Sequence, residues 1–219
     1  MDQKIAGLLE RTFTEGRTYE VIVTTMRDRG QGPPNAAAIG VVRRGQFLTM
    51  KVFKGSDTFD NLLAMKRLGI NVITGDHIDM LAMAALRGWG STEAEFGPEQ
   101  YEDIRELPVL KFAAIQIDCA VEEWAEKDGK DNYGHYHNAT FNAIPQAYRV
   151  KDENGRPIER GTKVVLEALV FATRWKVAEG ELKQFLWQRL KVYIQKALDL
   201  GGEANLKALG LINDFLAKG

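Results

Sequence analysis

The sequence predicts an α+β protein that is mainly β: an antiparallel β-domain with short inserted helices, followed by a C-terminal helical subdomain. Two observations predict this class. Segments rich in β-branched residues recur through the first two thirds of the chain, separated by turn residues. The last third instead carries apolar residues at helical spacing. We therefore expect one domain at 1–160 and a helical subdomain, packed on it, at 161–219.

Local patterns place the individual elements along the chain. The segments with strand composition are 19–26, 36–43, 46–53, 70–74 and 111–124, of which the first three form an expected meander. The segments with helical periodicity are 1–13, 58–68, 76–87, 164–177, 181–200 and 203–217. The polar stretch 127–160 is expected to be a loop. The acidic stretch 89–108 is expected to be a solvated connector whose charges carry no chemistry.

Composition argues against several classes of protein. A formal net charge of −1 leaves no basic excess to hold a nucleic-acid backbone. The single cysteine, Cys119, excludes an intramolecular disulfide and a cysteine-only metal site, and its apolar strand predicts an inert core thiol. No apolar run reaches the length of a membrane span, and the N-terminus lacks the apolar core of a signal peptide. We expect a cytoplasmic protein that binds neither nucleic acid nor membranes.

One short segment of the β-domain has residues suited to binding an anion. Gly55 allows close backbone approach, and Ser56 and Thr58 are good N-cap types. A helix that begins here directs unpaired N–H groups and its positive dipole end toward a ligand. Lys51 and Lys54 add positive charge just upstream. The pattern suits a phosphate, although the same residues occur in any capped helix.

Three longer segments carry a family pattern. The first is the strand–loop–strand EVIVTT…PNAAAIGVV, the second is GSDTFDNL followed by NVIT, and the third is ERGTKVVLEALVFATRW. Through them the chain resembles the FMN-binding split-barrel superfamily, and most closely a prokaryotic domain-of-unknown-function family within it. The third segment is the most specific, because general flavin reductases lack it. The resemblance covers most of 19–175 and departs at Glu159, where the family usually has asparagine, and in the length of the loop at 127–158.

The resemblance implies a six-stranded split barrel that assembles as a homodimer, with two FMN sites in the subunit interface. It implies that Ser56 and Thr58 hold the FMN phosphate. It also implies that the edge of the isoalloxazine lies against the backbone near Thr25 and residues 35–37. The full set of expected cofactor-binding residues is Thr25, Asn35, Ala36, Ala37, Lys51, Lys54, Ser56, Thr58, Asn61, Asn71 and Arg174.

Several of these residues have a second interpretation. The alanines at 36–38 also suit tight strand packing, Asn61 could instead cap a neighbouring loop, and Asn71 could be a turn residue. Arg174 follows Glu167 by about two helical turns, so the two side chains can share a face. They could form a salt bridge between the subdomain and the barrel, or contact substrate or phosphate across the dimer interface.

Catalytic motifs are sparse. His135 and His137 have the spacing of two metal ligands on a strand, but no third ligand is identifiable, so we expect no metal. Their segment is instead expected to be a surface loop or a substrate-side loop over the flavin. No Ser-His-Asp set, phosphate loop or dinucleotide fingerprint is present. Any chemistry would then belong to the flavin.

The function that the sequence predicts is an FMN-binding, flavin reductase-like oxidoreductase. A small-molecule substrate or a nicotinamide electron donor would be its partner. The alternatives are a non-catalytic flavin carrier or sensor, and a structural homodimer without cofactor.

Overall fold

The computed structural model describes residues 2–27, 33–86, 94–131 and 134–217. These residues fall into two compact units. The first contains Met1–Thr14 and Tyr19–Ile158, and the second contains Glu15–Thr18 and Glu159–Gly219.

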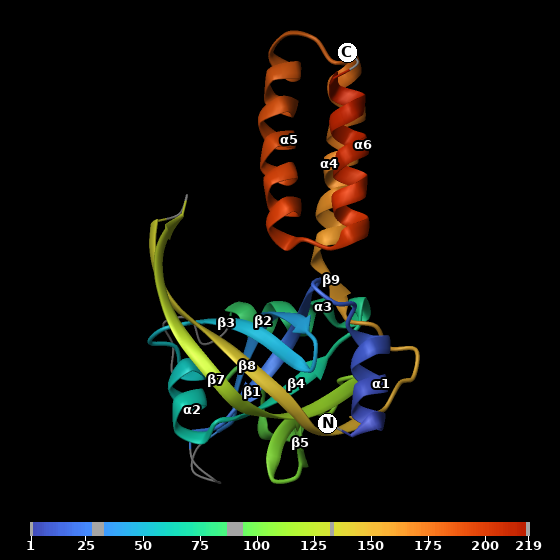
Figure 1. The fold of residues 1–219 in the computed structure, drawn as a ribbon. Coiled ribbons are helices and arrows are strands. Elements are labelled where there is room, and N and C mark those ends of the chain that lie inside the picture. The colour runs from blue at the N-terminus through green and yellow to red at the C-terminus, as the bar shows by residue number, and fades with distance from the viewer. Residues whose placement is uncertain (1, 28–32, 87–93, 132–133, 218–219) are drawn as a thin grey trace. The chain divides into compact units, whose positions relative to one another are not determined.

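A closed six-stranded antiparallel barrel forms the first unit, which confirms the predicted fold class (Figure 1). Its strands are β1 (Thr18–Thr25), β2 (Asn35–Arg44), β3 (Phe47–Phe53), β4 (Arg67–Val72), β7 (Ile115–Asp131) and β8 (Gly134–Val150). Their order is β2-β3-β8-β7-β4-β1, and the pairing of β1 with β2 closes the barrel. A seventh short strand, β9 (Ile158–Glu159), lies beside β1.

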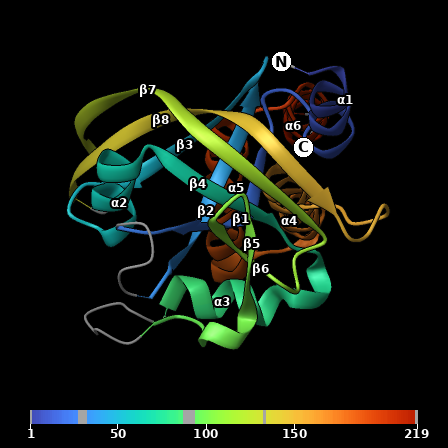
Figure 2. The same ribbon diagram turned by 90° about the horizontal axis from the view of Figure 1, so that it is seen from below.

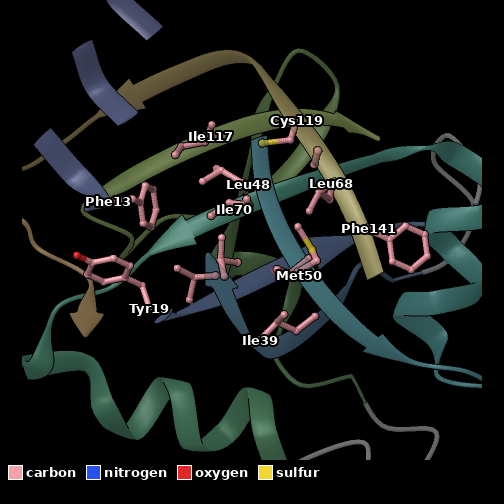
Figure 3. Packing of buried hydrophobic residues seen from close by; sticks show 14 of the residues in the cluster. Phe13, Tyr19, Ile39, Leu48, Met50, Leu68, Ile70, Ile117, Cys119 and Phe141 are labelled. Carbon is pink, nitrogen blue, oxygen red and sulfur yellow. The ribbon is translucent and has the colours of Figure 1, made fainter. Parts of the chain in front are cut away.

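Alternating side chains divide the apolar residues between the inside and the outside of the barrel. Val21 and Val23 belong to the inner cluster, whereas Ile22 between them belongs to a second cluster outside it. Figure 3 shows that side chains from β3 and β7, such as Leu48 and Ile117, meet in this interior. The two faces of β1 therefore serve two different cores.

Helices complete the first unit. They are α1 (Gln3–Thr12), α2 (Asp57–Met65) and α3 (Ile78–Leu86), with the short turns η1 (Gly75–His77) and η2 (Pro98–Gln100). Leu8 and Leu9 of α1, with Phe59 and Leu62 of α2, join the inner cluster. Ala84 of α3 packs in the outer cluster. Figure 2 shows α2 and α3 on separate sides of the barrel, so each encloses a different region of its surface.

Two expectations for connecting segments are wrong. The stretch expected as a loop after residue 127 contains the long strand β8, which pairs with β7 from Ile115↔Val150 to Asp131↔Gly134 (Figure 1). The stretch expected as a connector at 89–108 contains β5 (Tyr101–Ile104) and the start of β6 (Leu107–Leu110), which pair as a hairpin. Glu102 of this hairpin forms ion pairs with Arg149 and Lys151, so its charge is structural rather than merely solvated.

The second unit is a group of three helices, α4 (Arg160–Val177), α5 (Gly180–Leu200) and α6 (Glu203–Ala217). Their shared core includes Val165, Leu190 and Leu209. Glu159 is the N-cap of α4, and its carboxylate accepts hydrogen bonds from the backbone N–H groups of Gly161 and Thr162 at 2.7 and 2.8 Å. Glutamate therefore performs here the capping that asparagine can provide. Among the described residues, no helix has both the length and the apolar character needed to cross a bilayer.

Candidate functional site

Four polar side chains from three elements form one hydrogen-bonded network in the barrel unit. The Asn35 amide at the start of β2 donates to Thr58 Oγ1 at 2.9 Å and lies 3.3 Å from Thr25 Oγ1. The Asn61 amide on α2 donates to the same Thr25 hydroxyl at 3.1 Å. Thr25, Thr58 and Asn61 are buried, and Asn35 is half-buried. We refer to these four residues as the polar network.

The alternation of the strands explains why the polar network forms. Thr25 follows Val23 by two residues, so its side chain lies on the face of β1 that is turned toward the barrel interior. Asn35 precedes Ala37 by two residues, and Ala37 packs against the same inner cluster. Polar side chains thus replace apolar ones where β1 ends and β2 begins, and α2 supplies their partners. Burial of these groups is tolerated because they bond to one another.

The start of α2 lies next to the polar network and is open to solvent. The Ser56 hydroxyl donates to the carbonyl of Phe53 at 2.8 Å and accepts from the N–H of Phe59 at 3.2 Å, which makes Ser56 the N-cap. The N–H groups of Asp57 and Thr58 come before any intrahelical acceptor. Gly55 is exposed with φ +81°, and a Cβ added there would meet nothing within 4 Å. A ligand can therefore approach this turn closely.

Charged side chains around this turn partly cancel. Lys54 Nζ pairs with Glu126 Oε2 on β7 at 2.6 Å, and the hydrogen bond and charge of Glu126 raise the pKa of Lys54. Asp57 and Asp60 place two carboxylates in the first turn of α2, where they stabilise the helix dipole. Lys51 is exposed on β3. An anion at this turn would gain the N–H groups, but it would compete with Glu126 for Lys54.

Two of the expected residues, Asn71 and Arg174, belong neither to the polar network nor to the segments next to it. Asn71 is fully buried in β4, where its amide donates to the Ile22 carbonyl at 3.0 Å and to Thr24 Oγ1 at 3.1 Å. Its Oδ1 accepts from the N–H of Leu110 at 2.7 Å. Both polar atoms of the Asn71 side chain therefore link β4 to β1 and β6. Arg174 is exposed on α4, in the helical unit.

Sequence reasoning missed one residue at this edge of the barrel, Glu95. Its side chain is buried, with 8% exposed, and its Oε2 accepts the backbone N–H of Ala36 at 3.1 Å. Glu95 falls in the acidic stretch that was expected to be solvated. The available signal was its neighbour Phe96, a large apolar residue that joins the outer cluster together with Ala36.

The expected histidine pair is described only in part. His137 Nδ1 lies 2.8 Å from Asp128 Oδ1 across the β7–β8 hairpin. The side chain of His135 lies outside the described residues. In the ranges that the structure describes, no three His, Cys, Asp or Glu side chains gather as a metal site requires. Cys119 is buried in β7, and burial raises the pKa of its thiol well above the usual range.

Comparisons with known proteins support the split-barrel assignment. An FMN-bound protein of the DUF447 family from Methanosarcina mazei is 26% identical, over 95% of this chain and 100% of that one, with a TM-score of 0.51. Nitrilotriacetate monooxygenase component B from Bacillus cereus is 15% identical, over 73% of this chain and 87% of that one, with a TM-score of 0.51. At this identity the similarity is one of fold alone. No curated protein matches the sequence.

The family pattern identified in the sequence is confirmed. Residues 19–132, just over half of the chain, match the family described as "Protein of unknown function (DUF447) N-terminal domain". These residues include all of β1 except Thr18 and the whole of β2 to β7, and they contain the whole polar network. The chain therefore belongs to the DUF447 family of split-barrel proteins.

Proposed function

We propose that this chain binds FMN in its split barrel and acts as a flavin reductase-like oxidoreductase, as a homodimer in the cytoplasm. The observation that carries the proposal is the polar network beside the open start of α2. It brings Thr25 and Asn35 together with Thr58 and Asn61 from a segment more than twenty residues away. The FMN-bound relative from Methanosarcina mazei, aligned over 95% of this chain, supports the choice of cofactor.

The start of α2 fits the FMN phosphate. A phosphate monoester carries close to two negative charges and several strong acceptor oxygens. The turn at Gly55 is open, and the helix offers the N–H groups of Asp57 and Thr58, while the Ser56 hydroxyl would turn from the Phe53 carbonyl to donate to the phosphate. Lys51 would supply positive charge from the neighbouring strand. This donor set is what a phosphate needs, since hydrogen bonds to a charged group are the strong ones.

The opening of β2 fits the flat ring. Residues 35–37 are Asn-Ala-Ala, so small side chains leave the backbone approachable. The polar network fixes the amide of Asn35 through two hydroxyls and would orient it toward the ring edge. Bound FMN would supply hydride transfer between a nicotinamide and an acceptor. The protein's own residues would bind and orient the flavin and shield one side of it from water.

The visible spectrum of the purified protein tests the proposal. We expect a flavin spectrum after addition of FMN, and bleaching when NADPH or NADH is added anaerobically. A flavin spectrum that neither nicotinamide bleaches would instead support a carrier or sensor. A colourless protein that binds no added FMN would leave only the structural homodimer. Light scattering on the same sample would test the dimer.

The Lys54–Glu126 ion pair gives a prediction about affinity. Glu126→Gln releases Lys54 from its carboxylate partner, so we expect FMN to bind two- to fivefold more tightly at low salt, by removal of a competing charge. The gain should shrink as ionic strength rises, since both side chains are exposed. Fluorescence titration of FMN at two salt concentrations measures it. Glu122→Gln, on the same strand, is the matched control and should leave the affinity unchanged; equal affinities in all three proteins would place the phosphate away from Lys54.

A further inference from the structure

A buried carboxylate lies on the outer side of the β2 opening. Glu95 Oε2 accepts the N–H of Ala36 at 3.1 Å, and the Tyr101 hydroxyl reaches the carbonyl of Pro34 at 3.4 Å. Both contacts come from the segment that precedes and begins β5. This segment therefore holds the backbone immediately before and after Asn35, on the side opposite to the polar network.

The position of this carboxylate is electrostatically unusual. Glu95 is more than nine-tenths buried, among apolar neighbours that include Ala36 and Phe96. Burial, and then the nearby Glu95 charge, raise the pKa of the Tyr101 phenol well above its usual range. A charge in such surroundings is poorly screened by solvent and salt, so it acts over a longer distance than a surface charge does.

We propose that Glu95 is a positioning residue of the flavin site: it holds the Ala36 N–H, and it places a fixed negative charge behind the β2 opening that makes bound FMN harder to reduce. This inference rests on the proposed function, because it needs a flavin ring against residues 35–37. Two-electron reduction adds negative charge to the polar edge of the isoalloxazine. A carboxylate fixed behind that edge stabilises oxidised FMN relative to reduced FMN, which is one of the means by which a protein tunes its cofactor.

The size of the effect follows from simple electrostatics. Two unit charges about 10 Å apart at an effective dielectric constant of about 20 change an equilibrium by roughly tenfold. The ratio of the affinities for oxidised and reduced FMN should change by that factor when the charge is removed. For a two-electron couple, a tenfold change corresponds to about 30 mV. A low potential suits a protein that passes electrons on to an acceptor.

The experiment compares the midpoint potential of bound FMN in the wild type with that in Glu95→Gln. Glutamine keeps the shape and an acceptor oxygen for the Ala36 N–H, but it removes the charge. We expect the potential to rise by about 30 mV, with the affinity for oxidised FMN changing less than threefold. Glu99→Gln, an exposed carboxylate four residues along the chain, is the matched control and should leave the potential unchanged.

A purely structural role for Glu95 would alter the affinity for FMN and leave the potential where it was, and this outcome would overturn the inference. A second measurement needs no variant, in case Glu95→Gln fails to fold. In the wild type, the midpoint potential of bound FMN should lie below that of free FMN, and a value at or above it would also overturn the inference. A protein that binds no FMN would remove the proposed function as well, so the two failures are distinguishable.

Discussion

Ser56→Asp should weaken FMN binding by about 100-fold while leaving the fold intact. Ser56 caps α2, and aspartate is as good an N-cap as serine, so the helix should still begin at Asp57. The new carboxylate would face the phosphate, repel it, and remove a hydroxyl donor. The loss of the hydrogen bond to the Phe53 carbonyl should lower the free energy of unfolding by about 1 kcal/mol. Isothermal titration with FMN measures the affinity, and urea unfolding of the cofactor-free protein measures the stability.

Ser56→Asn is the control that separates charge from capping. Asparagine also caps helices well and differs from aspartate by one uncharged amide. We expect it to lose much less affinity than Ser56→Asp, within about tenfold of the wild type. Equal losses in the two variants would mean that the site responds to side-chain size and that no phosphate lies at this turn. Thr58 is the poorer choice for this test, because its hydroxyl accepts from Asn35 in the buried polar network.

The barrel strands near the N-terminus were predictable because their signals are local. Alternation in β1 separates Val21 and Val23 from Ile22, and the structure places them in two different cores. The cap of α2 was equally local, since Ser56 and the residues it bonds span only seven positions. Such features depend on side-chain periodicity and on hydrogen bonds between near neighbours, which a sequence displays directly.

Strand β8 was missed because its local signals contradict its tertiary role. Pro145 lies within the strand, and a proline normally argues against an interior strand. The structure resolves the conflict with an irregularity: Asp118 pairs with Ala147 while the next residue, Cys119, pairs with Pro145, so the register shifts at the proline. The position of the extra residue in β8 depends on the pairing with β7, so the sequence of β8 alone does not reveal it.

The polar network was predictable residue by residue but not as a network. Thr25, Asn35, Thr58 and Asn61 were all expected at the site, yet no periodicity links the end of β1 to a helix that begins more than thirty residues later. Their contacts depend on closure of the barrel. Asn71 was also expected at the flavin, and this stays a prediction; the structure shows its amide bonded to the Ile22 carbonyl and to the N–H of Leu110. Long-range pairing decides which polar residues gather in the network and which join the strands to one another.

Gly69→Ala should destabilise the barrel by about 3 kcal/mol, the upper end of what overpacking costs. Gly69 lies in β4 with ordinary backbone angles, so its conformation does not explain why a glycine is present. The reason is space: an added Cβ would clash with Thr24 Oγ1, and it would lie 2.9 Å from Val109 Cγ1 and 3.0 Å from the Pro108 carbonyl oxygen. The last two of these atoms belong to β6, and Val109 is fully buried in a small cluster with Ile104 and Leu107, so β6 would have to shift to make room. Urea unfolding monitored by tryptophan fluorescence measures the loss.

Gly7→Ala is the matched control, because it makes the same substitution where a Cβ would meet nothing within 4 Å. Gly7 lies inside α1, and alanine is the better helix former there by about 1 kcal/mol, so this variant should be at least as stable as the wild type. The contrast tests the packing of β6 against β4 in particular. Thr24 also donates to the Pro108 carbonyl at 2.6 Å, and the same added methyl would disturb that bond. If Gly69→Ala and Gly7→Ala unfolded at the same urea concentration, β6 could not lie against β4 as closely as the structure places it.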